Sequence, residues 1–226
     1  MTAAQLAIVI PVLNEAHGIE SALKALAPMR AHGVQVIVVD GGSHDDTVAL
    51  ALPLVDYVLT CAKGRARQMN AGAARATATN LLFLHADTRL PIDANEQVLA
   101  ALGAGAVWGR FDVSIEGTSP MLRVVAACMN LRSRLSGIAT GDQAIFVRTD
   151  SFVQVGEFPD QPLMEDIELS KRLKRLSRPA CLSAHAVTSG RRWETRGVWR
   201  TIVLMWSLRW RYWCGASPEQ LARAYH

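Results

Sequence analysis

The chain has 226 residues, half of them apolar, and a formal net charge of +4 from 24 basic and 20 acidic side chains. This size and apolar content fit one compact domain with a large core. No stretch reaches the roughly 18–20 apolar residues that span a bilayer. No basic region precedes the N-terminal apolar run, so we expect no signal peptide. The four cysteines are far apart and form no CxxC or Cys/His cluster, which disfavours disulfides or structural zinc and fits a cytoplasmic protein.

Strand and helix patterns alternate through the first 90 residues. Short apolar runs predict four strands, over residues 6–11, 34–39, 55–60 and 80–86. Helical patterns lie between them, including an apolar pattern over 19–26 and a glycine-led, alanine-rich stretch over 64–76. This alternation predicts an α/β fold of the Rossmann type, a mostly parallel sheet flanked by helices, with a nucleotide-binding half over residues 1–90.

The second half, residues 91–190, has a different pattern. The segment WGRFDVSIE at 108–116 alternates large apolar with polar residues, which predicts a half-exposed strand, antiparallel at the sheet margin. A helix, a strand and a strongly amphipathic helix are predicted to follow, over 121–135, 144–148 and 164–176. We therefore expect one domain over 1–190, whose second half includes a smaller antiparallel portion, and a helical extension over 191–226.

The C-terminal extension concentrates charge and aromatic side chains. Between Arg191 and Trp213, six arginines accompany one glutamate, and five of the six tryptophans of the chain lie there. Arginine and tryptophan on one helix suit a membrane–water interface. The alternative is a helix that packs its aromatic face on the domain. No recognised nucleic-acid module accompanies the pattern, so we expect no nucleic-acid partner. In SPEQ, Ser217 is the expected N-cap of a last helix.

Acidic residues stand where predicted strands end or a helix begins. Asp40 follows the second strand and Asp87 the fourth, while Glu165 and Asp166 open the amphipathic helix. Ligands of open α/β sheets bind beyond the carboxyl ends of the strands, so we expect these residues to share one site. Neighbouring carboxylates repel unless a positive charge lies among them. A divalent cation bound to a phosphorylated substrate would supply that charge.

Six short motifs occur in order along most of the chain: PVLNE, DGGSHDDT, KGRARQMNAG, HADT, GDQ and MEDIELSKRL. Together they resemble the inverting glycosyltransferase family 2, whose members have the GT-A fold and use nucleotide-diphosphate sugars. The resemblance runs from Ile8 to Trp193, where SGRRWE is similar to the RW-containing motif of the family. The layout is also similar to a short bacterial subgroup named for its association with radical-SAM/selenodomain genes.

The resemblance implies donor contacts beyond the first strands, with UDP or GDP as the nucleotide. Asp40 is similar to the family carboxylate that accepts a hydrogen bond from the base, although it could instead cap the next helix. Pro11 and Glu15 lie where the family contacts base and ribose, although Glu15 could simply begin a helix. Arg65 and Arg67 lie at a glycine-led helix start, which suits a diphosphate. We expect one of these two arginines to be a surface residue.

The HADT motif implies a divalent cation, Mn²⁺ or Mg²⁺. Asp87 is the expected ligand, and one carboxylate is sufficient because Mg²⁺ keeps several waters. His85 lies on the same side of an extended chain and is a second candidate, since Mn²⁺ tolerates imidazole better than Mg²⁺ does. The alternative for His85 is a hydrogen-bonded structural role. Many family members have aspartates where His85 and Ala86 stand, so we expect metal binding to depend on the donor diphosphate.

Inversion requires a base that takes the acceptor proton as the hydroxyl attacks opposite the leaving diphosphate. The family places this base at the aspartate of MEDIELS, which is Asp166. Glu165 is expected either to share the acceptor contact or to cap the helix. For the pair, the alternative role is stabilisation of the helix dipole.

Acceptor contacts are expected from the GDQ turn and the SGRRWE segment. Asp142 and Gln143 lie on the acceptor side of the family, together with Arg192 and Trp193. Trp193 either stacks on a sugar or lipid-linked substrate or packs in the core. Ser189 stands where processive members have glutamine and no membrane spans follow, which favours a single addition. The acceptor is an unknown small or lipid-linked molecule.

Two other functions remain open at this point. A sugar-phosphate nucleotidyltransferase would share the α/β core, but it normally carries a glycine-rich basic loop directly after the first strand, and PVLNEAHG is not such a loop. The second is a non-catalytic, membrane-associated module that binds sugar nucleotides, because the metal motif is reduced.

Overall fold

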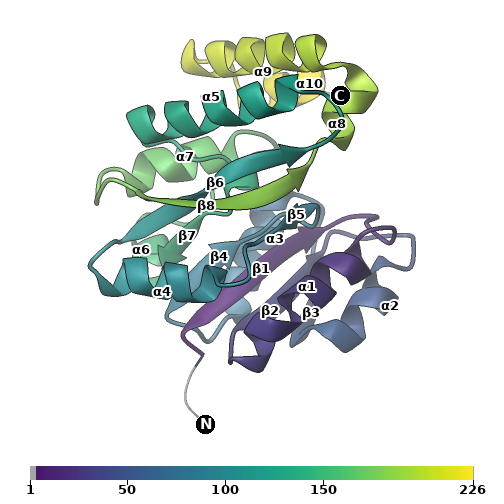
Figure 1. Ribbon diagram of the computed structural model, residues 1–226, viewed down its shortest axis with the longest axis vertical. Helices are drawn as coiled ribbons and strands as arrows, with labels where there is room; N and C mark the ends of the chain where they lie inside the picture. The colour runs from purple at the N-terminus through teal and green to yellow at the C-terminus, as the bar shows by residue number, and fades with distance from the viewer. Residues whose placement is uncertain (1–3, 226) are drawn as a thin grey trace.

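The computed structural model describes residues 4–225, which form one mixed sheet with helices on both faces (Figure 1). The strands are β1 (Leu6–Val12), β2 (Gln35–Asp40), β3 (Tyr57–Thr60), β4 (Asn80–Phe83), β5 (Thr88–Arg89), β6 (Trp108–Glu116), β7 (Phe146–Arg148) and β8 (Ala180–Ser189). The helices are α1 (Ile19–Ala31), α2 (Thr47–Ala51), α3 (Arg65–Arg75), α4 (Ala94–Gly103), α5 (Met121–Ser136), α6 (Thr149–Gln154), α7 (Glu165–Leu173), α8 (Arg191–Arg196), α9 (Val198–Trp213) and α10 (Pro218–Tyr225). Short 3₁₀ turns lie at Leu52–Leu54 and Gly141–Gln143.

The four predicted N-terminal strands form one half of the sheet, in the order β3-β2-β1-β4, and all are parallel as expected. Successive side chains of β1 enter the core on opposite faces of the sheet. Ile8 packs in the cluster that contains Ile19 and Leu23 of α1, and Val9 packs in the cluster that contains Met69 of α3. The strands are apolar throughout because both faces are covered by helices.

Helix α3 lies unusually close to this half of the sheet. A Cβ atom at Gly72 would lie 2.3 Å from Val9 Cγ1, so only glycine fits there. Gln68, one turn earlier, donates from Nε2 to the carbonyls of Val12 and Val39, both at 2.8 Å. These carbonyls end β1 and β2, so α3 joins the two strand ends from which the ligand-facing loops begin.

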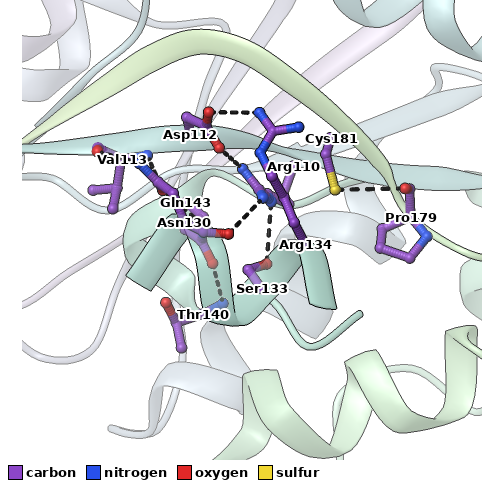
Figure 2. Close-up of polar contacts among 10 residues, drawn as sticks. All are labelled: Arg110, Asp112, Val113, Asn130, Ser133, Arg134, Thr140, Gln143, Pro179 and Cys181. Atoms are coloured by element: carbon purple, nitrogen blue, oxygen red, sulfur yellow. Dashed lines mark hydrogen bonds and ion pairs between the residues drawn. The ribbon is translucent and has the colours of Figure 1, made fainter. Parts of the chain in front are cut away.

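Residues 108–116 form a strand, β6, but the predicted position and exposure of this strand are wrong. It lies inside the sheet, antiparallel to β7 and parallel to β8, and is neither half-exposed nor at the margin. Its polar residues Arg110 and Asp112 are only 0% and 8% exposed. Arg110 donates to Asp112 and, at 3.1 Å, to Ser133 of α5, while Arg134 of α5 donates to Asp112 at 2.6 Å (Figure 2). An ion pair within β6, together with one ion pair and one hydrogen bond to α5, replaces water at these polar positions.

The C-terminal helices cover the outer side of α5 (Figure 1). Val198 of α9 packs with Leu122 of α5, and Leu208 of α9 packs with Leu221 of α10. The expected cap of the last helix is present, since Gln220 donates its backbone N–H to Ser217 Oγ at 3.3 Å. No helix within residues 4–225 has the length and apolar character needed to cross a membrane.

The aromatic residues of this segment divide into two groups. Trp193 packs on the cluster that contains Val113 and Leu122, as the packing alternative predicts. The tryptophans of α9 do not follow that alternative: Trp199, Trp206, Trp210 and Trp213 are 62–75% exposed.

Candidate active site

Charged side chains from several elements meet beyond the carboxyl end of β4. Arg65, the first residue of α3, lies within reach of the charges of Glu165, Asp166, Asp142 and Asp87. Those carboxylates come from the start of α7, the Gly141–Gln143 turn and the loop after β4. A small pocket at this point is lined by Arg65, Met69, Phe83, His85, Gly141, Ile145, Phe158, Glu165 and Asp166. Asp87, Glu165 and Asp166 therefore lie near Arg65, whereas Asp40, which was expected to share the site, is not among the carboxylates whose charges act on it.

Asp166 has the environment of a proton acceptor. Its carboxylate accepts backbone hydrogen bonds from Gly141 at 2.9 Å and from Ile167 at 2.7 Å. Burial and the charge of Glu165 raise the pKa of Asp166 to about 6, although these hydrogen bonds and the charge of Arg65 oppose the rise. Asp166 is thus ionised at neutral pH and holds a proton more tightly than an ordinary aspartate.

Glu165 and Arg65 form an ion pair at the base of the site. The Glu165 side chain is 4% exposed and lies 3.4 Å from the Arg65 guanidinium. It points into the cluster, where it raises the pKa of Asp166. Both arginines are about half exposed, and they differ in their partners: Arg67 pairs with exposed Asp160 at 2.8 Å, whereas the partner of Arg65 is buried. Arg65 is therefore the arginine that faces the acidic cluster.

His85 and Asp142 connect the loop after β4 to the Gly141–Gln143 turn. His85 Nδ1 lies 3.2 Å from Asp142 Oδ1, and a Cβ at Gly141 would lie 2.3 Å from His85 Nε2. Burial would raise the pKa of Asp142, but the hydrogen bond and charge of His85, with Arg65 and Arg192, hold it below its usual value. His85 Nε2 is buried and has no hydrogen-bond partner within the described chain.

The contacts of Asp87 and His85 indicate which of them could bind a cation. Asp87 is exposed, and within residues 4–225 its carboxylate accepts only a long hydrogen bond of 3.4 Å from Thr88 Oγ1, so it is available to a metal ion. One nitrogen of His85 contacts Asp142 and the other lies beside Gly141, an arrangement that fits its structural alternative. No group of three or more His, Cys, Asp or Glu side chains in residues 4–225 is arranged to hold a metal. A cation here would need oxygens from a bound diphosphate.

Glu15 and helix α8 border the cluster on the other side. Arg191 lies 3.9 Å from Glu15. Burial, with the charges of Asp87 and Asp45, raises the pKa of Glu15 even though the charge of Arg191 opposes it. Burial and neighbouring arginines lower the pKa of Arg192, whose guanidinium stacks on the Tyr225 ring at 4.4 Å. Arg192 therefore lies near enough to Arg65, Asp142 and Asp87 for their charges to act on it.

Hydrogen bonds connect the loop after β1 to the loop after β2. Asn14 donates its backbone N–H to Ser43 Oγ, and Glu15 donates its own to Thr47 Oγ1, both at 2.8 Å. Together with Gln68, which joins the strand ends, these bonds make one rigid wall of the crevice. Sequence reasoning missed Gln68, because nothing in a helical pattern marks a glutamine that turns inward.

Asp40 is turned onto its own loop. It is 3% exposed, and its carboxylate accepts backbone hydrogen bonds from Gly42 at 2.9 Å and Ser43 at 3.0 Å. It does not cap α2, which begins only at Thr47. Pro11 is partly exposed near the end of the neighbouring strand. Burial first, and then the charge of Asp40, raises the pKa of Cys61, so Asp40 lies on the β2–β3 side of the crevice.

Gln143 lies behind the site. It is 0% exposed, its Oε1 accepts the backbone N–H of Thr140 at 3.2 Å, and its amide donates to Asn130 of α5 at 3.4 Å (Figure 2). Its side chain therefore holds the turn against α5 instead of facing an acceptor. Trp193, packed on α5, likewise takes the core-packing alternative. Of the expected acceptor-side residues, Asp142 and Arg192 face the crevice.

Arg132 of α5 is a further residue that sequence reasoning missed. The charges of Asp166 and Asp142 act on its guanidinium, while burial lowers its pKa. Its Nη2 atom is buried without a hydrogen-bond partner in the part of the chain that is described. A signal existed, because residues 121–136 contain three arginines and no acidic residue, so any counter-charge must come from elsewhere.

The chain is similar in fold to solved structures of glycosyltransferases. Mannosyltransferase PcManGT from Pyrobaculum calidifontis, in complex with GDP-Man and Mn²⁺, has a TM-score of 0.70 and 17% identity, covering 100% of this chain and 70% of that one. Glucosyl-3-phosphoglycerate synthase from Mycobacterium tuberculosis, with Mn²⁺ and UDP, has a TM-score of 0.61 and 18% identity, covering 82% and 71%.

TarS from S. aureus, in a structure of residues 1–349, has a TM-score of 0.67 and 17% identity. The alignment covers 82% of this chain but only 60% of that TarS structure. Together these neighbours confirm the predicted GT-A fold, a mixed sheet flanked by helices.

Comparison of the sequence itself identifies the family. No curated protein matches the chain significantly in sequence. The profile described as Glycosyl transferase family 2 matches residues 7–155, more than half of the chain. The match ends at residue 155, before Asp166. The chain belongs to glycosyl transferase family 2.

Proposed function

We propose that the protein transfers a sugar from a nucleotide-diphosphate sugar to an acceptor hydroxyl, with inversion and as a single addition. The observation that carries the proposal is Asp166: its pKa is raised to about 6, and it lies at a helix start beside Arg65 and an exposed Asp87. The layout of the motifs also leads us to propose that the chain belongs to the short bacterial subgroup associated with radical-SAM/selenodomain genes.

On the donor side, the bonded loops after β1 and β2 would bind the nucleotide through Pro11, Glu15 and Asp40. UDP and GDP are both candidates, because neighbours of this fold were solved with UDP-GlcNAc and with GDP-Man and Mn²⁺. Arg65 would balance the diphosphate charge from the start of α3. A Mn²⁺ or Mg²⁺ ion bound by Asp87 and the diphosphate would stabilise the negative charge that develops on the leaving group.

On the acceptor side, Asp166 would accept the proton of the attacking hydroxyl. The oxygen forms a bond to the anomeric carbon on the face opposite the diphosphate, and the bond from that carbon to the diphosphate oxygen breaks. Glu165 keeps Asp166 basic, while the backbone N–H groups of Gly141 and Ile167 hold its carboxylate in position. Asp142 and Arg192 would contact the acceptor.

The first experiment identifies the donor. The wild-type protein is heated with UDP, UDP-GlcNAc, GDP or GDP-Man, each with and without Mn²⁺, because a ligand that binds the native state raises its apparent melting temperature. We expect one nucleotide class to raise the melting temperature, and more so with Mn²⁺. No stabilisation by any of these ligands would contradict the proposed donor class.

The second experiment tests Asp166. With the donor so identified, Asp166→Asn should lower transfer or donor hydrolysis by about 10²–10⁴-fold, the usual contribution of a general base, while the donor-induced thermal shift persists. Glu96→Gln, an exposed carboxylate of α4, is the matched control and should retain activity. Lost donor binding in Asp166→Asn, or full activity, would remove the assignment of Asp166 as base.

The same assays address the alternatives. A nucleotidyltransferase would release pyrophosphate from a nucleoside triphosphate and a sugar phosphate, and the family match favours glycosyl transfer instead. A non-catalytic module would bind the donor without metal-dependent hydrolysis, and Asp87→Ala would then leave the assay unchanged.

A further inference from the structure

Helix α9 exposes a continuous row of large apolar side chains. Trp199, Val203, Trp206, Trp210 and Trp213 follow one another at alternating spacings of four and three residues, which places them on one face of the helix. They are 62–75% exposed. Soluble monomers rarely leave so much apolar side chain together in water, so a row of this kind marks a contact surface.

The row is fixed in its outward direction because the opposite face of α9 is packed. Thr201 and Leu208 are buried, and Leu204 and Met205 pack on the cluster that includes Met164. Figure 1 shows α9 as the outermost layer on its side of the molecule, far from the sheet half that contains β1 to β3. The tryptophans are thus presented to solvent by a rigid helix.

Helix α5 extends this surface. It runs beside α9 (Figure 1), and its Val124, Leu131 and Leu135 side chains are 51–73% exposed. An open groove is lined by Arg132, Val203, Trp206, Ser207, Arg209, Trp210 and Trp213. The surface therefore combines indole rings with aliphatic side chains from two helices.

The same surface is positively charged. Helices α5 and α9 carry six arginines and no acidic residue. Arg123, Arg200 and Arg211 are exposed, and their side chains make no hydrogen bond or ion pair within residues 4–225. The favoured partner is therefore anionic as well as apolar.

We propose that α9, with the adjoining face of α5, docks on the surface of an anionic phospholipid bilayer. The helix lies parallel to the membrane, the tryptophans and Val203 enter the interface between headgroups and acyl chains, and the flanking arginines contact lipid phosphates. Tryptophan prefers this depth because its ring is apolar while its N–H remains near water. The proposal does not depend on the proposed transfer reaction.

Two other occupants fit less well. In a two-fold dimer the same surface would meet itself, so arginines would oppose arginines. A single-stranded nucleic acid would satisfy the arginines and stack on tryptophan, but it would leave Val203 and Leu135 without apolar partners. Acyl chains satisfy both kinds of side chain.

Docking would bring the bilayer close to the acceptor side of the crevice. Arg132 lines the tryptophan groove, and the charges of Asp166 and Asp142 also act on it. Arg132 thus lies between the groove and the candidate base Asp166. Its Nη2 atom is buried and has no hydrogen-bond partner in the described residues.

The test measures binding of the wild-type protein to vesicles by cosedimentation and tryptophan fluorescence. Vesicles of phosphatidylcholine mixed with phosphatidylglycerol, an anionic lipid of the kind that attracts polybasic segments, are compared with vesicles of pure phosphatidylcholine. We expect binding to the anionic vesicles that weakens with salt, and quenching of the indoles by lipids brominated on their acyl chains. This measurement needs no variant and therefore no assumption about variant folding.

Variants then assign the surface. Trp206→Ala/Trp210→Ala should lower the vesicle partition coefficient by about tenfold or more. Arg200→Glu/Arg211→Glu should lower it by about 25-fold or more, at about fivefold for each basic residue lost. Ile92→Ala is the matched control, because Ile92 is 83% exposed but lies outside the surface, and its partition should equal that of the wild type.

Several outcomes would overturn the proposal. These are absent binding to anionic vesicles, unquenched indoles, or equal partition of wild type and both double variants. Dimerisation that the Trp206→Ala/Trp210→Ala variant abolishes, without vesicle binding, would instead assign the surface to a second copy. Binding of polyuridine without vesicle binding would assign it to nucleic acid.

Discussion

The two halves of the sheet position their ligand-facing residues by different means. In the half that contains β1 to β4, backbone groups do most of the positioning: the loops after β1 and β2 are joined by bonds from Asn14 and Glu15 to side chains of the opposite loop. In the other half, charged side chains do it: Arg110 and Asp112 are buried between β6 and α5, and the half-exposed Arg134 pairs with Asp112.

This difference affects how each half depends on pH and on single charges. The bonds from Asn14 and Glu15 go to neutral hydroxyl groups, so they persist over a wide pH range. Buried charges make the other wall more polar on the side where an acceptor would react. The loss of one charged partner, however, leaves the charge of the other buried and uncompensated. The comparison therefore predicts where substitutions are costly.

The largest expected effect is on the buried ion pairs of the β6 half. Arg110→Met should lower the free energy of unfolding by at least about 3 kcal/mol, because Asp112 remains buried with only one of its two cationic partners. Urea denaturation measures the change. The control is Arg89→Met, whose exposed pair with Glu116 at 2.9 Å should contribute at most about 1 kcal/mol. Equal effects of the two substitutions would remove the distinction between the halves.

The second prediction concerns the cost of the raised pKa. A carboxyl with a folded-state pKa near 6 and an ordinary unfolded value binds its proton more tightly when folded, so Asp166 lowers stability as pH rises through that interval. Between pH 4 and pH 8, the stability of Asp166→Asn relative to wild type should therefore rise, by up to about 3 kcal/mol. Urea denaturation at both pH values gives the difference.

Any fixed cost of the introduced amide cancels in that comparison, since it is present at both pH values. Glu96→Gln is the control and should show a difference near zero. A stability difference that is independent of pH would contradict the environment assigned to Asp166.

The same contrast explains what the sequence could predict. The parallel strands were recognisable because burial on both faces makes each run apolar, as in β1 and β2. The order of motifs predicted the family, and the residues after β4 and at the start of α7 were expected to meet, which they do around Arg65.

Where the sequence misled, side chains distant in the chain decide the outcome. Strand β6 looked half-exposed because its arginine and aspartate alternate with apolar residues, and only the arrival of α5 turns that alternation into buried ion pairs. Arg65 and Glu165 are 100 residues apart, and His85 and Asp142 are 57 apart. No local pattern reports such partners, so neither the pairing of Arg65 nor the buried position of His85 was predictable.

The third prediction concerns the half of the sheet that contains β1 to β4. Gln68→Leu should lower the free energy of unfolding by about 1–3 kcal/mol, because the carbonyls of Val12 and Val39 lose a buried donor. It should also raise the KM for the donor more than it changes kcat, since it loosens a binding wall and leaves Asp166 untouched. Gln97→Leu on α4 is the control. A fall in kcat with unchanged KM would contradict this division.

The smallest effect concerns Arg65, which reaches from the first half to the carboxylates of the second. Arg65 is the first residue of α3, which belongs to the first half of the molecule. Its charge lowers the pKa of Asp166, which belongs to the second half. In Arg65→Met, the acidic limb of kcat against pH, measured at saturating donor, should therefore move to higher pH, a loss of a few-fold near pH 6 that fades by pH 8. Arg67→Met removes an equal charge two residues away, but its surface pair with Asp160 lies outside the cluster, so its profile should match that of the wild type. If both variants moved the limb equally, the effect would come from net charge, and Arg65 would not be the link between the donor wall and the base.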